Sequence, residues 1–148
     1  IGDYAFYRCD ALTSVTIPNS VTSIGHGAFS DCSSLESLTI GNSVNSIDYY
    51  AFNECDNLIQ ITCLPETPPT VGENVFSNYN AYLYVPCDSK QKYDLHATWG
   101  SFKYIECIEE TALEDVKMPD ESDIKILCGG QLLILRDDKT YTVMGQEL

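Results

Sequence analysis

The sequence predicts a mainly β protein: a right-handed parallel solenoid of 23-residue coils, with a short capping helix and a small C-terminal β module. Three observations lead to this fold class. Apolar residues recur every 23 positions over residues 1–64, the period then ends in a segment patterned like a lid, and short apolar runs separated by turn residues follow residue 123. Self-similarity at a fixed period of this length is typical of stacked repeats.

The repeat is clearest in its apolar columns. Ile1, Ile24 and Ile47 are 23 residues apart, and residues 71–76 begin a fourth unit one residue late. Four further columns keep the same spacing: Ala5, Ala28 and Ala51; Phe6, Phe29 and Phe52; Cys9, Cys32 and Cys55; Leu12, Leu35 and Leu58. One coil cannot bury its own apolar side, whereas stacked coils bury a continuous core with strands about 4.8 Å apart.

Each coil is expected to contain a short strand and a tight bend. Val15 and Ile17 alternate with polar residues as in a strand, which Pro18 then ends. Gly2 and Gly25 suit the bend between the two walls of the coil because glycine adopts unusual backbone angles easily. Residues 83–86 have the pattern of a last repeat strand.

A capping segment follows the last coil. Asp88 is expected to be the N-cap of a short helix, with Gln91 reaching back to it, and apolar residues up to Ile105 cover the end coil. We therefore assign residues 1–110 to the solenoid with its cap.

The remainder of the chain divides in two. Residues 111–123 are polar and acidic and are expected to be a linker. Residues 124–148 form the small β-strand tail module, with strands expected at 124–127, 131–136 and 140–143 and turns at 129–130 and 137–139.

The unit I-G-x-x-A-F-x-x-C-x-x-L-x-x-V-x-I resembles the BspA-like, Treponema-type leucine-rich repeat of bacterial surface proteins, over residues 1 to about 86. The cap resembles the terminal cap of such repeats in Bacteroides-type proteins. The resemblance implies a leucine-rich-repeat solenoid that is extracellular or at the cell surface and that serves adhesion. Ile1 lies inside a repeat, so we expect upstream sequence, including any export signal.

Charge argues against several classes of partner. Eight basic residues against 22 acidic ones give a net charge of −14. Residues 1–64 carry −6, residues 65–110 carry −4 and residues 111–148 carry −4, so the acidity is spread along the chain. Such a surface repels phosphate backbones and anionic lipid, and no apolar run approaches the ~18 residues of a membrane helix. We expect no nucleic-acid partner and no direct membrane insertion.

Uncharged hydrogen-bonding residues alternate with the core residues of the strands. They are expected to form two columns on one sheet face, namely Ser14, Ser37 and Gln60, then Thr16, Thr39 and Thr62. One interpretation is a ligand-binding face, and the other is simple strand propensity, because threonine favours strands. Aromatic residues at variable positions of the bend are a second candidate surface for a partner: Tyr4, Tyr7, Tyr49 and Tyr50.

The cysteine column has a structural interpretation and a chemical one. Cys9, Cys32 and Cys55 lack a C-x-x-C pair and a histidine in register, which favours a ladder of small buried side chains over a metal or redox site. A disulfide between neighbours is conceivable, although parallel Cβ vectors suit it poorly. The sequence alone does not place the thiols of Cys87 and Cys107.

No catalytic constellation is evident. His26 is expected at an exposed variable position and His96 in the capping helix, and neither has an acidic or cysteine partner at ligand spacing. Residues 120–123 lack the glycine and the spaced carboxylates of a calcium loop. We therefore expect no enzyme activity, no cofactor and no metal.

The sequence favours non-catalytic recognition of a protein or a glycan at the bacterial surface. Two alternatives stay open at this point. The repeats could be the accessory domain of a larger secreted enzyme, or they could be a structural spacer.

Overall fold

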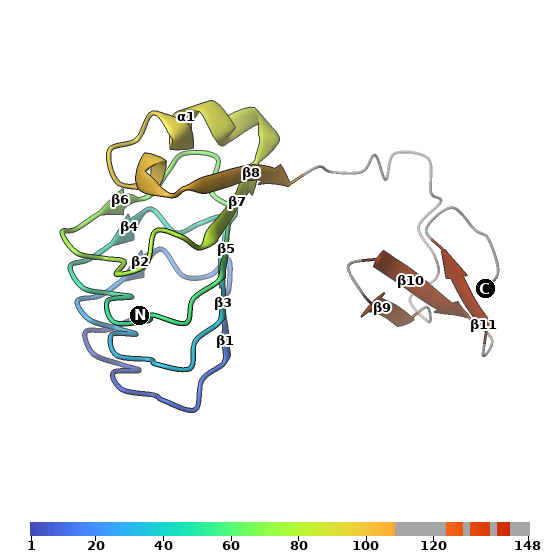
Figure 1. The fold of residues 1–148 in the computed structure, drawn as a ribbon, viewed down its shortest axis with the longest axis horizontal. Coiled ribbons are helices and arrows are strands. Elements are labelled where there is room, and N and C mark those ends of the chain that lie inside the picture. The colour runs from blue at the N-terminus through green and yellow to red at the C-terminus, as the bar shows by residue number, and fades with distance from the viewer. Residues whose placement is uncertain (109–123, 129–130, 137–138, 143–148) are drawn as a thin grey trace. The chain divides into compact units, whose positions relative to one another are not determined.

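The computed structural model describes residues 1–108, 124–128, 131–136 and 139–142. The chain divides into two compact units, Ile1–Glu109 and Glu110–Leu148. The first unit is a stack of coils with a cap at one end, and the second contains three strands (Figure 1). The architecture is the β-rich repeat fold that the sequence predicts.

The main sheet of the first unit takes one strand from each coil. Its order is β1-β3-β5-β7-β8, and every neighbouring pair is parallel. Val15 lies opposite Leu38, which lies opposite Ile61, so the 23-residue period of the sequence becomes the register of the sheet. The strands are β1 (Ser14–Ile17), β3 (Ser37–Ile40), β5 (Gln60–Cys63), β7 (Tyr82–Pro86) and β8 (Tyr104–Ile108).

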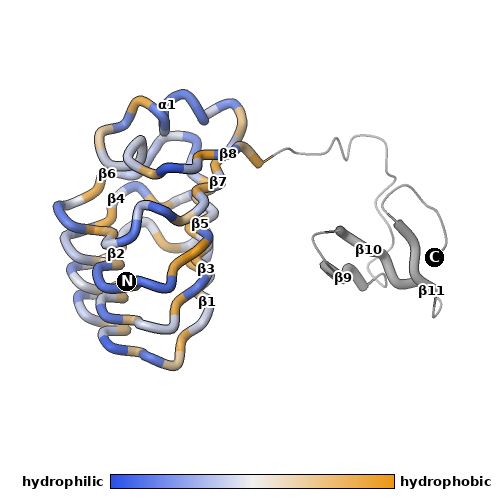
Figure 2. The backbone as a smooth tube through the Cα atoms, viewed as in Figure 1, coloured by the Kyte–Doolittle hydropathy of each residue, from blue (hydrophilic) through white to orange (hydrophobic). Residues whose placement is uncertain are grey.

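A second parallel sheet forms another wall of the coils. It contains β2 (Ser23–Ile24), β4 (Ser46–Ile47) and β6 (Thr70–Val71). Ile24 pairs with Ile47 at a separation of 23, whereas Ile47 pairs with Val71 at 24, which confirms the late start of the fourth unit. Figure 2 shows hydrophobic and hydrophilic stretches recurring from coil to coil along the tube.

Columns of identical residues pack along the stack; in the phenylalanine column Phe29, Phe52 and Phe76 are buried in the core, whereas Phe6 of the first coil is 41% exposed. Phe6, Phe29, Phe52 and Phe76 stack with ring centroids 4.9, 5.2 and 5.7 Å apart and interplanar angles of 5°, 4° and 7°. Each such pair contributes about 0.5–1.5 kcal/mol beyond its burial. Because the same contact recurs at each level, stacking fixes the spacing of the coils.

The bends do not depend on the two glycines that the sequence suggested. Positive φ angles occur instead in two other rows: Tyr4, Gly27 and Tyr50, then Arg8, Asp31 and Glu54. Gly25 has a different role, because a Cβ there would lie 2.8 Å from the backbone nitrogen of Asp3 in the coil below. The left-handed positions cost roughly 1–2 kcal/mol at each non-glycine residue.

The cap differs from the prediction in three respects. It contains η1 (Cys87–Ser89), α1 (Lys90–Asp94) and η2 (Trp99–Ser101), followed by β8. The predicted N-cap was wrong: Asp88 lies inside η1, and Ser89 precedes α1 with no side-chain capping bond. Gln91 lies inside α1 and its predicted reach back to Asp88 is not formed. The strand at 83–86 is also not the last of the sheet, because β8 pairs with it.

Side chains of the cap form hydrogen bonds with backbone carbonyl groups of the irregular third coil. Residues 64–69 contain three prolines, which cannot donate backbone hydrogen bonds. The carbonyl groups of this segment accept hydrogen bonds from side chains of the cap. Tyr93 Oη donates to the Pro65 carbonyl at 2.7 Å, and Trp99 Nε1 donates to the Pro69 carbonyl at 2.9 Å. Ser89 Oγ and Lys92 Nζ both donate to the Glu66 carbonyl, at 2.7 and 2.9 Å. Burial raises the pKa of Tyr93, which keeps its hydroxyl a donor.

The second unit is a three-stranded antiparallel sheet. Its order is β11-β10-β9, from β9 (Ile124–Cys128), β10 (Gln131–Arg136) and β11 (Lys139–Thr142). Lys139 belongs to β11, and not to the turn in which the sequence placed it. The predicted linker at 111–123 and the predicted turns at 129–130 and 137–138 lie outside the described residues.

Candidate functional site

The six polar residues predicted from strand alternation come together on one side of the main sheet, which we call the strand face. Ser14, Ser37 and Gln60 occupy one register row, and Thr16, Thr39 and Thr62 occupy another. Ser14, Thr16 and Gln60 are exposed, and the other three are half-buried. Ile17, Ile40 and Cys63 of the same strands are buried, so the strand face is held on a packed backbone.

Both rows continue into residues that sequence reasoning missed. Gln60 pairs with Tyr82, and Tyr82 with Tyr104; Thr62 pairs with Tyr84, and Tyr84 with Glu106. We call these four residues, Tyr82, Tyr84, Tyr104 and Glu106, the tyrosine patch. The available signal was a spacing of 22 instead of 23, which the strict period hides because the cap coils are one residue shorter.

The predicted bend aromatics form a separate cluster. The His26 ring lies between Tyr4 and Tyr50, with centroids 5.1 and 5.7 Å away in edge-on geometry, and Tyr7 contacts Tyr4 at 5.7 Å. The structure brings three of the four predicted tyrosines together, while Tyr49 is exposed and stacks with none of them. Tyr4 and Tyr50 have positive φ, so the bend backbone sets their direction.

The cysteine column is a ladder of thiols with a hydrogen-bonding role. Cys32 Sγ donates to the Phe6 carbonyl and Cys55 Sγ to the Phe29 carbonyl, each at 3.2 Å. Both are buried, Cys9 is partly so, and all three thiols are free. Burial raises the pKa of Cys32, and raises that of Cys55 to about 12. A thiol that stays protonated at neutral pH is a poor nucleophile and a poor metal ligand.

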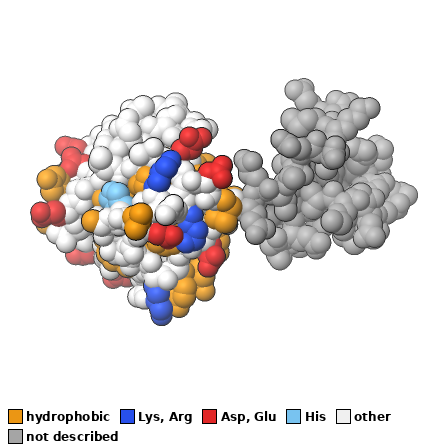
Figure 3. Space-filling view, turned by 90° about the horizontal axis from the view of Figure 1, so that it is seen from above, with side chains coloured by type: hydrophobic (Ala, Val, Ile, Leu, Met, Phe, Trp, Pro, Cys, Tyr) orange, Lys and Arg blue, Asp and Glu red, His pale blue; other side chains and the backbone are white. Residues whose placement is uncertain are grey.

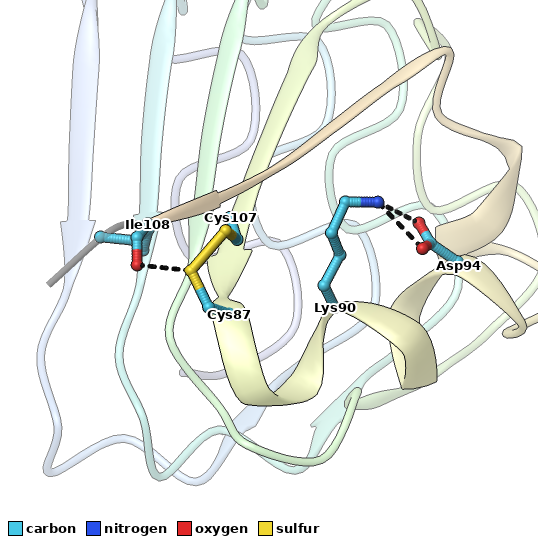
Figure 4. The surroundings of a disulfide bond; sticks show 5 residues. All are labelled: Cys87, Lys90, Asp94, Cys107 and Ile108. Carbon is cyan, nitrogen blue, oxygen red and sulfur yellow. Dashed lines mark hydrogen bonds and ion pairs between the residues drawn. A yellow bond between two sulfur atoms is a disulfide. The ribbon is translucent and has the colours of Figure 1, made fainter.

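The two cysteines that the sequence left unplaced form a disulfide, Cys87–Cys107, with Cα atoms 4.5 Å apart (Figure 4). It joins the end of β7 to β8. Cys87 Sγ also lies 3.1 Å from the Ile108 carbonyl oxygen, a close contact in which the bonded sulfur has no proton to donate. Nearby, Lys90 pairs with Asp94 at 2.9 Å within α1. The disulfide therefore fastens the cap strand to the stack.

The histidines have structural surroundings. His96 follows α1, and was wrongly expected inside the helix; its Nδ1 accepts the backbone N–H groups of Thr98 and Trp99 at 3.2 and 3.4 Å, which caps η2. Within the part of the chain that the structure describes, no three histidine, cysteine or acidic side chains are arranged to hold a metal ion. A hollow of about 550 Å³ lies between the turn at 42–45 and the proline-rich segment, lined by asparagine, serine, threonine and proline residues together with Val44 and Glu66.

Comparison with known families matches residues 1–124 to a BspA type leucine-rich repeat region in six copies. The chain belongs to the BspA-type leucine-rich-repeat family. The match extends past residue 86, where the sequence resemblance ended, and so takes in the cap. Repeats of the BspA type indicate a protein-interaction module. Comparison with curated proteins found no match.

The strand face and the cluster of Tyr4, Tyr7 and Tyr50 around His26 are the two candidate surfaces of this BspA-type chain for such an interaction. No helix among the described residues is long and apolar enough to cross a membrane.

Proposed function

We propose that this chain is a non-catalytic adhesion module that docks a protein partner on the strand face, outside the cell or at the bacterial surface. The observation that carries the proposal is the pair of aligned polar rows on the main sheet. Their backbone is fixed by pairing on both sides in β3 and β5 and by a packed core beneath. A partner that docks there meets preorganised hydrogen-bonding groups, so little entropy is lost.

Two observations support an extracellular, non-catalytic role. The Cys87–Cys107 disulfide fits an oxidising compartment, since cytosolic thiols are kept reduced. The buried thiols have raised pKa values, and His96 is engaged in capping. These groups serve packing and local structure, which leaves them unsuited to nucleophilic or acid–base work.

A binding panel tests the proposal. The biotinylated chain is immobilised and exposed to purified extracellular-matrix and serum proteins, with a glycan array as a parallel probe. For any protein that binds, Thr39→Arg should weaken affinity at least about tenfold, because it places bulk and charge at the centre of the strand face. Its thermal melt, followed by circular dichroism, should change little because Thr39 lies outside the core.

Tyr49→Leu on the bend is the control and should bind like the parent. If Thr39→Arg and Thr62→Arg bind normally while changes at Tyr49 and Tyr50 abolish binding, the partner docks on the bend and the proposed face is wrong.

A further inference from the structure

The tyrosine patch is a compact two-by-two arrangement on adjacent strands. Tyr82 and Tyr84 come from β7, and their register partners Tyr104 and Glu106 come from β8. The Tyr82 and Tyr104 rings stack with centroids 4.6 Å apart and an interplanar angle of 14°, and Tyr82 and Tyr84 lie 6.3 Å apart at 18°. Three nearly parallel rings therefore border one carboxylate.

The rings are held in place before any partner arrives. Stacking across the strands restricts their side-chain torsions, and the disulfide fastens β8 to β7 beside them. Tyrosine has few torsions to lose, and a prestacked tyrosine loses fewer still on binding. Preorganised, partly exposed tyrosines are the kind of residue that dominates binding energy at protein interfaces.

The charges around the tyrosine patch favour a positively charged group on the partner. Lys103 Nζ lies 5.0 Å from the centroid of the Tyr104 ring, so one end of the stack already carries a cation. Glu106, the register partner of Tyr84 on β8, is exposed and forms no ion pair with any residue of the described ranges. Residues 1–108 have four basic and twelve acidic side chains, a net charge of −8. In Figure 3, which views this unit from the cap end, acidic side chains are spread more widely over the visible face than basic ones.

We propose that the tyrosine patch binds an arginine side chain from a basic segment of the partner protein. The guanidinium would stack on the exposed tyrosine surface and pair with the Glu106 carboxylate. This inference rests on the proposed function, that the strand face docks a protein, and it names the anchoring contact at the cap end of that face.

Arginine fits this geometry better than lysine. A guanidinium is planar, stacks on aromatic rings, and gives a carboxylate two parallel hydrogen bonds, whereas an ammonium is a compact and strongly hydrated point charge. Attraction to the net negative unit alone would treat the two equally. A preference for arginine over lysine at equal charge therefore separates a built site from general electrostatics.

The test uses the full chain and two short fluorescent peptides, one of alternating arginine and glycine and one of alternating lysine and glycine. Fluorescence anisotropy at low ionic strength should show the arginine peptide binding about tenfold more tightly. Tyr82→Leu and Glu106→Gln should each remove most of that preference. Tyr49→Leu is the matched control, because Tyr49 and Tyr82 are 47% and 45% exposed, and it should keep the preference.

Equal affinity for the two peptides, absence of binding, or an equal loss in Tyr49→Leu would overturn the proposal. If Tyr82→Leu fails to fold, Glu106→Gln still tests the proposal, because it removes one exposed charge without changing the size of the side chain. A protein partner that Thr39→Arg releases but Glu106→Gln does not would support the strand face and reject the arginine site. Arginine-selective peptide binding in a chain that binds no protein of the panel would support the arginine site and reject the strand face as a protein-docking surface.

Discussion

Removal of the Cys87–Cys107 disulfide is expected to lower the free energy of unfolding of the first unit by about 3 kcal/mol. The two cysteines are 20 residues apart in the sequence, so the bond closes a loop of that length. The chain-entropy relation for such a loop gives about 11 cal/mol/K, or about 3 kcal/mol at 25 °C. The reduced Cys87 thiol recovers a little, since it can donate to the Ile108 carbonyl oxygen that it already contacts.

Urea unfolding followed by circular dichroism measures this change. The parent is compared with and without dithiothreitol, and with the double variant Cys87→Ala/Cys107→Ala. Reduction should lower the parent midpoint to slightly above that of the double variant, because only the reduced parent keeps the Cys87 thiol beside the Ile108 carbonyl. The midpoint of the double variant itself should not change. A parent midpoint that reductant does not move, or native-state labelling of both cysteines without reductant, would refute the reasoning.

Three further predictions concern the coils. Cys32→Ser should cost less than about 1 kcal/mol in urea unfolding, because the hydroxyl keeps the hydrogen bond that the thiol donates; a larger loss than in Cys32→Ala would contradict this. Burial raises the pKa of Cys55 from 9.0 to about 12, so its folded form holds a proton that the unfolded form releases. The resulting stability is complete below about pH 9 and should decline between pH 9 and 12, a decline that should be smaller in Cys55→Ala. Glu54 has a φ of 57°. Glu54→Gly should therefore stabilise the fold by about 0.5–1 kcal/mol and raise the melting temperature, because the left-handed strain that it relieves exceeds the entropy that glycine adds to the unfolded chain. Glu36→Gly, at a residue without a positive φ, should lower the melting temperature.

The sequence predicted what repetition can encode. Columns such as Ile1, Ile24 and Ile47 carry the core and the register, and alternation within the strands gave the two polar rows. The strict period hid the tyrosine patch, since the last coils change length. The buried cysteine ladder was predicted, but the Cys32 hydrogen bond was missed, because its acceptor is a backbone carbonyl and has no sequence signature.

The cap failed for a related reason. The pattern after Pro86 fits a capping box with Asp88 as the N-cap. In the structure Ser89 occupies the N-cap position of α1, and its hydroxyl donates a hydrogen bond to the Glu66 carbonyl, which lies 23 residues earlier in the chain. The local capping bond is therefore absent, and a hydrogen bond between residues that only the stacked fold brings close is present in its place. The Cys87–Cys107 pairing is of the same kind, because β7 and β8 become neighbours only in the sheet.

The hydrogen bonds between the cap and the proline-rich segment determine at which position in the stack a further coil can be inserted. The first two coils meet through the same phenylalanine, cysteine and strand contacts that join the second to the third. A duplicated 23-residue unit inserted there presents matching surfaces above and below. The third coil offers no such freedom, because its carbonyl groups are matched to Tyr93, Ser89 and Trp99 of one particular cap. Recombination within the family should therefore transfer the last coils and the cap together, as a single exchangeable end piece.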